Sequence, residues 1–319
     1  SYLPGEVSGG WILDQFNLAG GVSSALVDSQ TICNTIHKMS SSAYDSGMLS
    51  IESYFEGHLA QGRAYFTREE AQAALGLSPH ALSVALTRQA RKGRVAHPRR
   101  GFYLILRPED RAFGAPDPAR WIDPLMKYLQ LDYRVALLRA AAFHGASHQA
   151  AMVFQVIVPR QMRGFELGRQ RLEFVYQRAE AFAQVNRPVW LGSIKSEAGF
   201  AKVAGLELTL LDCARYFHKA AGINGLAQIA KDLGGQARPD DLVQIAVHYE
   251  NSAVCRLGYL LERAGHVAQA DVLRPFVRRA KTAALLDPSV KPLVEGLFDL
   301  HEKAPGWRLI VNESVEIDF

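Results

Sequence analysis

The stretch from Thr67 to Gly93 constrains the fold most, because its residues mark where two helices begin and end. Thr67-Arg68-Glu69-Glu70 is a capping box, in which the threonine hydroxyl accepts from the Glu70 amide and the Glu70 carboxylate accepts from the Thr67 amide. Gly76 ends the first helix, since glycine takes the left-handed conformation at little cost. Ser78-Pro79 starts the second helix with a serine N-cap and a proline in the first turn. These signals for the start and end of two successive helices predict a helix-turn-helix.

The second helix has two unlike faces, and two short strands follow it. An apolar stripe faces inward and consists of Leu82, Ala85, Leu86 and Ala90. Small, hydroxylic and basic side chains fall on the other face, as a helix that reads a DNA groove requires: His80, Ser83, Val84, Thr87, Arg88 and Arg91. Residues 94–96 and 102–105 then predict two strands joined by the turn 97–101, which would be the wing of a winged helix-turn-helix.

Basic residues are concentrated in this part of the chain. Nine arginines and lysines lie between Arg63 and Arg107, against only Glu69 and Glu70. A local basic excess favours a phosphate backbone as partner. The residues predicted to contact DNA are His80, Ser83, Thr87, Arg88, Arg91, Lys92, Arg94, Arg99 and Arg100. Two alternatives remain: a helical pair with a solvated basic face, and a winged module that binds protein.

The remaining chain predicts a second, larger domain. Residues 1–47 are rich in glycine and serine and are either an upstream extension or an arm that packs on the body. Residues 48–110 form the winged module and residues 111–319 form the body. The body begins with a proline- and glycine-rich linker at 113–118. Expected helices are 121–129, 133–143, 208–217, 226–233, 240–249, 253–264 and 290–302. Expected strands are 152–158, 171–176, 189–194, 307–312 and 315–319. The expected fold class is α+β, with a winged helix-turn-helix before a mixed body that has a small sheet and a C-terminal helical block.

Composition and cysteine spacing narrow the functional classes. The 319 residues carry a formal charge of +4, and no apolar run or signal peptide predicts a membrane association. Three distant cysteines predict neither disulfides nor a zinc site and suit a reducing cytoplasm. His144 is expected to cap a helix end, Asp212 to pair with an arginine or a cap, and Cys213 to be unreactive. No nucleotide-binding, hydrolase or nucleotidyltransferase motif is found, so the sequence predicts no catalytic residue, cofactor or metal.

From about residue 48 to the end, the chain resembles the AbiEi family of antitoxins. The winged module is followed by YRVALLRAAAFHG (133–145), the apolar strand 152–158, GLELTLLD (205–212), RLGYLLE (256–262) and the closing segment 307–318, and the order of these motifs carries the resemblance. Residues 1–47 lie outside the pattern.

The resemblance implies an autorepressor and antitoxin of a type IV toxin–antitoxin system. Its winged module would bind double-stranded operator DNA, usually at inverted repeats, and its body would counteract a nucleotidyltransferase-like toxin without a stable complex. Two other functions remain alternatives. One is a nuclease or transferase that its winged module delivers to nucleic acid, and the other is a protein-interaction adaptor.

Overall fold

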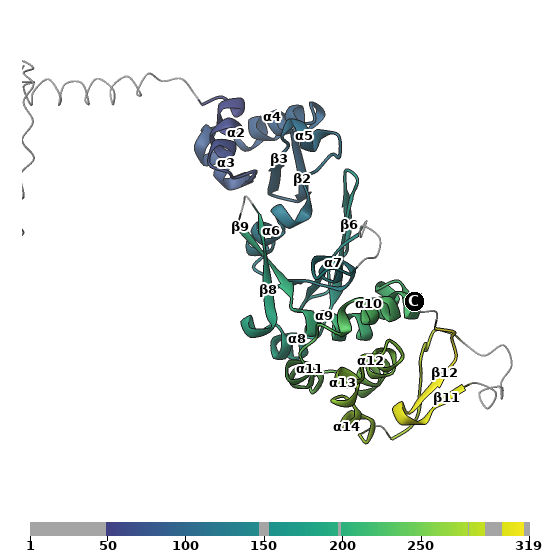
Figure 1. The fold of residues 1–319 in the computed structure, drawn as a ribbon. Helices are drawn as coiled ribbons and strands as arrows, with labels where there is room; N and C mark the ends of the chain where they lie inside the picture. Colours follow the sequence, from purple (N-terminus) through teal and green to yellow (C-terminus); the bar gives the residue numbers. More distant parts are fainter. Residues whose placement is uncertain (1–48, 147–152, 197–198, 280, 291–301, 316–319) are drawn as a thin grey trace, which may run out of the picture. The chain divides into compact units, whose positions relative to one another are not determined.

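Two helices, α3 (Arg68–Leu75) and α4 (Pro79–Arg91), form the predicted helix-turn-helix in the computed structural model (Figure 1). The Glu70 amide donates to Thr67 Oγ1 at 3.2 Å, and the Thr67 amide donates to Glu70 Oε2 at 2.7 Å. Gly76 ends α3 with a φ of +61°. Both ends of the first helix therefore follow the local sequence signals.

The structure describes residues 49–146, 153–196, 199–279, 281–290 and 302–315. The predicted N-terminal segment 1–47 lies outside these ranges. So do most of the predicted helix 290–302 and all but the first residue of the predicted strand 315–319.

A three-stranded antiparallel sheet completes the winged module, whose helices and strands lie between residues 51 and 105. Its other elements are α2 (Ile51–Ala60), β1 (Tyr65–Thr67), β2 (Val95–Arg99) and β3 (Phe102–Ile105). The strand order is β1-β3-β2, and the β2–β3 register shifts between Ala96 and Arg99. The sequence did not predict β1, because three residues carry no periodicity and pairing with β3 defines the strand. The predicted wing is present, although β2 continues beyond the expected end at Ala96 to Arg99.

The predicted linker at 113–118 packs against the body. It follows α5 (Pro108–Arg111), and Phe113 O accepts from the Arg169 amide at 2.8 Å. A Cβ on Gly114 would lie 2.7 Å from Gly168 Cα, so the two backbones meet where a side chain has no room. The segment is therefore fixed by a turn of the body sheet.

A six-stranded mixed sheet forms the first part of the body, with the order β6-β7-β5-β4-β9-β8. Its strands are β4 (Arg134–Val135), β5 (Val153–Val158), β6 (Phe165–Leu167), β7 (Gln170–Tyr176), β8 (Leu191–Ser196) and β9 (Gly199–Ala204). Strands β5 and β7, and likewise β4 and β9, pair in parallel. Short helical segments flank them: η1 (Pro118–Arg120), α6 (Ile122–Tyr128), α7 (Leu137–Phe143), α8 (Ala179–Val185) and η2 (Pro188–Trp190).

The predicted helix 133–143 is wrong in its first part. Arg134 and Val135 form β4, which pairs with β5 and β9, and the helix α7 begins only at Leu137, whose φ is +54°. The segment is rich in alanine and leucine and therefore favours a helix locally. Pairing on both sides of β4 and the burial of the Arg134 side chain override that preference.

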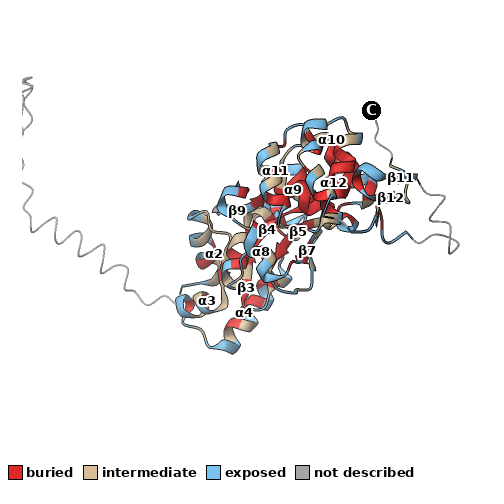
Figure 2. Cartoon of the chain, turned by 90° about the horizontal axis from the view of Figure 1, so that it is seen from below, coloured by how far each residue is buried: buried red, intermediate tan, exposed pale blue. Residues whose placement is uncertain are grey.

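Helices and a 3₁₀ turn form the C-terminal block, and they confirm the four helices predicted between 208 and 264. The elements of this block in the described ranges are α9 (Leu206–Arg215), η3 (Phe217–Lys219), α10 (Gly222–Gly234), α11 (Pro239–Ala246), α12 (Asn251–Arg263), α13 (Val267–Asp271) and α14 (Arg274–Val277). Most residues of α9 and α12 are buried (Figure 2).

A second three-stranded sheet lies beside this block and contains the predicted C-terminal strand. Its strands are β10 (Ala284–Leu285), β11 (Glu302–Ala304) and β12 (Leu309–Val311), in the order β10-β12-β11. The turn η5 (Pro305–Trp307) places Trp307 against Gly258 of α12 and leaves the indole 1% exposed.

The buried hydrophobic side chains of the described residues form two clusters. The smaller lies within the winged module, between Tyr54 and Ile105. The larger fills the body and includes Phe102 and Leu104 of β3, so one wing strand supplies side chains to the body core. The described residues from Leu49 onward form one compact unit, and independent folding of residues 48–110 stays a prediction. The predicted fold class, α+β with a winged helix-turn-helix before a larger mixed body, is confirmed.

Candidate nucleic-acid interface

Helix α4 turns one row of side chains to the surface. His80, Val84, Thr87, Arg88 and Arg91 are all exposed, and their spacing places them on a single helix face. The opposite face holds Leu82, Leu86 and Gln89, which are buried. The predicted division of the helix into an inner and an outer face therefore holds, with Gln89 added to the inner face.

Gln89 and Arg94 hold α4 against α2. Gln89 Nε2 donates to Glu52 Oε1 at 2.6 Å, and Arg94 Nη1 lies 3.7 Å from the same oxygen. The hydrogen bond from Gln89, together with the charge of Arg94, lowers the pKa of the Glu52 carboxyl. Arg94 was predicted to contact DNA, but its guanidinium is paired inside the module.

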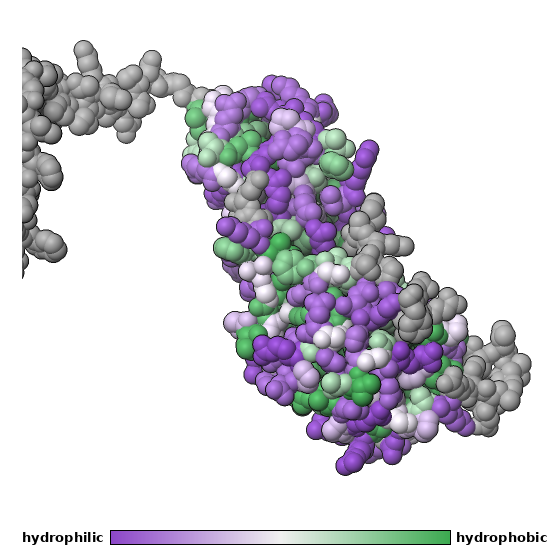
Figure 3. All heavy atoms as spheres, viewed as in Figure 1, coloured by the Kyte–Doolittle hydropathy of each residue, from purple (hydrophilic) through white to green (hydrophobic). Residues whose placement is uncertain are grey.

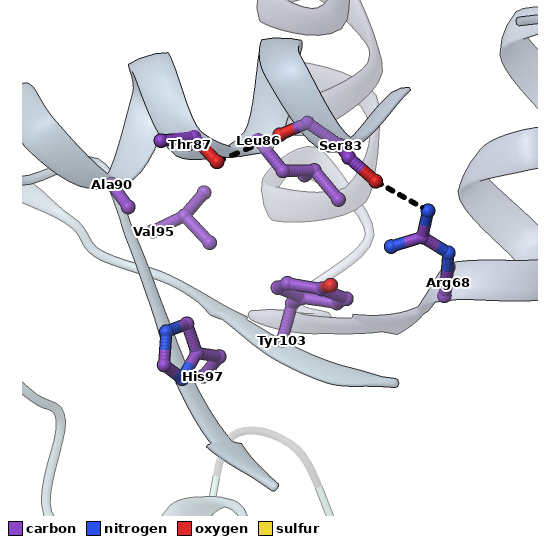
Figure 4. Close-up of a pocket in the computed structure, with 8 residues that line it drawn as sticks. All are labelled: Arg68, Ser83, Leu86, Thr87, Ala90, Val95, His97 and Tyr103. Atoms are coloured by element: carbon purple, nitrogen blue, oxygen red, sulfur yellow. Dashed lines mark hydrogen bonds between the residues drawn. The ribbon is translucent and has the colours of Figure 1, made fainter. Parts of the chain in front are cut away.

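Arg68 ties the start of α3 to the start of α4. Its Nη2 donates to Ser83 Oγ at 2.6 Å (Figure 4). The same Nη2 donates to Pro79 O at 2.8 Å, and Ser83 Oγ also donates to Pro79 O at 2.8 Å. Thr87 Oγ1 donates to Ser83 O at 2.8 Å. A hydroxyl has one proton to donate, so Ser83 and Thr87 can offer a nucleic acid only acceptor oxygens in this state. The sequence did not single out Arg68, although it belongs to the basic run, and did not predict its hydrogen bonds to Ser83 and Pro79.

A hollow of about 330 Å³ separates α4 from the wing strands. Arg68 and Ser83 border it on one side, and His97 of β2 and Tyr103 of β3 lie across from them (Figure 4). The Tyr103 ring stacks on Phe66 at a centroid distance of 5.2 Å, which keeps it in place. A further hollow continues from here to Arg100 at the tip of the wing.

Four predicted basic contacts remain available to a partner: Arg88, Arg91, Lys92 and Arg100. All four are exposed, and none forms an ion pair with another residue of the described ranges. In Figure 3, hydrophilic side chains cover much of the visible surface of the winged module. Arg99 differs, because its guanidinium contacts residues of the body sheet.

The other groups considered for chemistry have structural partners. Asp212 forms a buried bidentate pair with Arg134, as its predicted pairing with an arginine required. His144 Nε2 lies 2.7 Å from Ala204 O. Burial raises the pKa of the Cys213 thiol well above its usual value, opposite to the change that activates a nucleophile. In the described ranges, no three His, Cys, Asp or Glu side chains are grouped to hold a metal ion, and no helix is long and apolar enough to cross a bilayer.

Comparisons with known proteins agree with this arrangement. The model of the family "Transcriptional regulator, AbiEi antitoxin" matches residues 58–105, and that of the "AbiEi antitoxin C-terminal domain" matches residues 134–263. The crystal structure of the RV2827C protein from Mycobacterium tuberculosis is similar in fold, with a TM-score of 0.57 and 16% identity over 81% of this chain and 89% of that one. No curated protein matches this chain.

The two family matches fall on the winged module and on the body, in the order that the sequence motifs predict, and together take up more than half of the chain. Proteins of these families are transcriptional regulators and antitoxins of toxin–antitoxin systems, and neither model describes an enzyme. The chain, with its winged module and mixed body, belongs to the AbiEi antitoxin family.

Proposed function

We propose that the winged module binds double-stranded operator DNA at inverted repeats and represses the operon that encodes this chain. One observation carries the proposal: the outer face of α4 presents Arg88 and Arg91, and the wing presents Arg100, all three exposed and without an ion pair to another described residue. A helix of this kind fits the major groove, while a basic wing tip fits the adjoining phosphate backbone.

The side chains on this face suit different contacts. Arg88 and Arg91 can bond to guanine O6 and N7 or grip phosphates. Val84 has 46% of its surface exposed on the same face, where it can contact an apolar group such as the thymine methyl. Arg100 is assigned to a phosphate. Arg94 is not assigned to DNA, because it is paired with Glu52.

Fluorescence anisotropy with the chain's own promoter DNA tests this assignment. Arg88→Ala should change the order of preference among operator variants, since a bidentate contact is worth about 1–3 kcal/mol of discrimination. Arg100→Ala should weaken binding to all sequences alike and reduce the slope of log Kobs against log salt by about 0.9. Arg178→Ala is the matched control, because Arg178 is exposed on the body and its removal changes the net charge equally.

The outcomes separate the proposal from its alternatives. If the wild-type chain shows no preference for its own promoter over scrambled DNA at low salt, the repressor function is wrong and a protein-binding module is favoured. If Arg88→Ala lowers affinity uniformly, Arg88 is a phosphate contact.

We further propose that the chain is the antitoxin of a type IV system and counteracts a nucleotidyltransferase-like toxin without a stable complex. Membership of the AbiEi family supports this. The proposal expects a nucleotidyltransferase-like toxin to be encoded beside this chain. Co-expression of the chain with that toxin should restore growth, and the two proteins should not co-purify. Failure of the chain to relieve that toxicity would contradict the antitoxin role, and a stable complex would contradict type IV. An Arg88→Ala/Arg91→Ala variant that still restores growth would show that DNA binding and neutralisation are separate.

A further inference from the structure

The side chain of Arg99, the last residue of β2, is packed into the body. Its Nη2 donates to Arg163 O at 2.6 Å, and its guanidinium carbon lies 4.5 Å from the ring centroid of Phe165 and 5.7 Å from that of Phe174. Phe165 and Phe174 belong to β6 and β7 of the body sheet. Burial there lowers the pKa of Arg99, which agrees with a guanidinium partly removed from water.

Tyr128 of α6 holds the next residues of the wing. Its hydroxyl donates to Arg100 O at 3.1 Å, and a Cβ on Gly101 would lie 2.2 Å from that hydroxyl oxygen. The Tyr128 ring lies 5.5 Å from the ring of Phe102, which is 1% exposed. The turn of the wing is therefore held by the body at consecutive positions.

These contacts leave Arg99 and Arg100 with different surroundings, although they are neighbours of the same residue type. Arg100 is exposed and forms no ion pair with another described residue, whereas Arg99 donates to a body carbonyl and lies beside two aromatic rings of the body sheet. A phosphate contact through Nη2 would require Arg99 to leave that carbonyl. Stacking of this kind depends on the planar guanidinium, which lysine lacks.

We propose that Arg99 is a positioning residue: together with Tyr128 it fixes the wing on the body, so that the body determines where Arg100 meets the DNA. The inference rests on the proposed DNA-binding function and deepens it, because it makes the body part of the DNA-binding apparatus. Binding linkage is reciprocal, so operator DNA should in turn stabilise the joint between β2 and the β6–β7 hairpin.

Charge-conserving and charge-neutral variants of the full chain test the inference. Arg99→Lys should weaken operator binding roughly tenfold, nearly as much as Arg99→Ala, because the planar guanidinium beside the two phenylalanine rings is lost while the positive charge remains. Tyr128→Phe should also weaken binding, although it removes no charge. Arg178→Lys, on the exposed surface of the body, should bind like the wild type.

Hydrogen exchange without DNA provides the second readout. Amides of β3, β6 and β7 should exchange faster in Arg99→Lys than in the wild type, and Arg100→Ala should leave them unchanged. Wild-type affinity in Arg99→Lys, with a salt slope lowered by about 0.9 in Arg99→Ala, would instead make Arg99 a phosphate contact and overturn the inference. Unchanged exchange in Arg99→Lys would overturn it as well.

The exchange experiment also separates this inference from the proposed function. If the wild-type chain binds no DNA, the repressor function fails and Arg99 has no DNA contact to position. Faster exchange in Arg99→Lys would then still establish that Arg99 holds the wing on the body.

Discussion

The ion pair between Arg134 and Asp212 joins the body sheet to helix α9, and its removal should cost more than that of any surface pair. Arg134 Nε donates to Asp212 Oδ2 at 2.9 Å and Nη2 donates to Oδ1 at 2.8 Å, and both side chains are 0% exposed. Tyr249 Oη donates to Asp212 Oδ1 at 2.7 Å, and Gln177 Oε1 accepts from Arg134 Nη2 at 2.7 Å. The two charges are therefore held by hydrogen bonds from neighbouring side chains as well as by each other.

Removing one member leaves the other charge buried and unpaired. Asp212→Asn, Asp212→Leu and Arg134→Met should therefore each lower the free energy of unfolding by about 3–5 kcal/mol. The double variant Arg134→Met/Asp212→Leu should lose less than the sum of the single variants, because no unpaired charge remains. It should still lose about 1–3 kcal/mol, since Tyr249 and Gln177 are deprived of partners.

Urea unfolding followed by far-ultraviolet circular dichroism measures these losses. The exposed pair of Arg178 and Glu180, with side chains 75% and 79% exposed and 3.7 Å apart, is the control. Arg178→Ala should cost no more than about 1 kcal/mol. A loss below about 1 kcal/mol for Asp212→Asn, or losses in the double variant that equal the sum of the singles, would refute the argument from a buried, charged pair.

Two further predictions concern packing and pH. Gly258→Ala places a methyl group 2.1 Å from the Trp307 ring and should lower the melting temperature, because overpacking costs about 1–3 kcal/mol. In the control variant Gly57→Ala, the methyl group meets nothing within 4 Å and should raise the melting temperature slightly. Equal effects of the two substitutions would contradict the packing argument. Burial opposes ionisation of Glu70, but hydrogen bonds, first among them one from Arg63, lower the pKa of its carboxyl overall. The ionised Glu70 therefore stabilises the folded state above the usual glutamate pKa, and this stabilisation is lost as the pH falls through the lower folded pKa. The difference in unfolding free energy between the wild type and Glu70→Gln should accordingly shrink between pH 6 and pH 3, and a difference that persists at pH 3 would contradict the linkage.

Local signals predicted much of the winged module. The capping box at Thr67, the glycine at position 76 and the serine N-cap of α4 act on backbone groups within four residues, so the sequence identifies them without knowledge of the fold. The exposed face of α4 follows in the same way from the helical repeat. Four of the residues predicted to contact DNA are exposed and basic, and His80 and Thr87 are exposed on the same face; their contact with DNA stays a prediction.

Elements and side chains that depend on distant partners were missed. Residues 134–135 form a strand against their local preference because β5 and β9 pair with them on both sides. Arg94 is bound to Glu52 and Arg99 to the body, although in the sequence both look like their exposed neighbours. Nothing in the spacing of the arginines distinguishes them, since their partners lie 42 and 64 residues away.

The sequence by itself determined that two capped helices and a basic wing occur in order, that the body is mixed, and which family the chain resembles. The tertiary structure decided which basic side chains remain available to a nucleic acid, that Asp212 meets Arg134 across 78 residues, and that β3 contributes Phe102 to the body core. The reason is physical. Caps and periodicity act within one turn of a helix, whereas charge pairing and burial are settled only when distant segments come together.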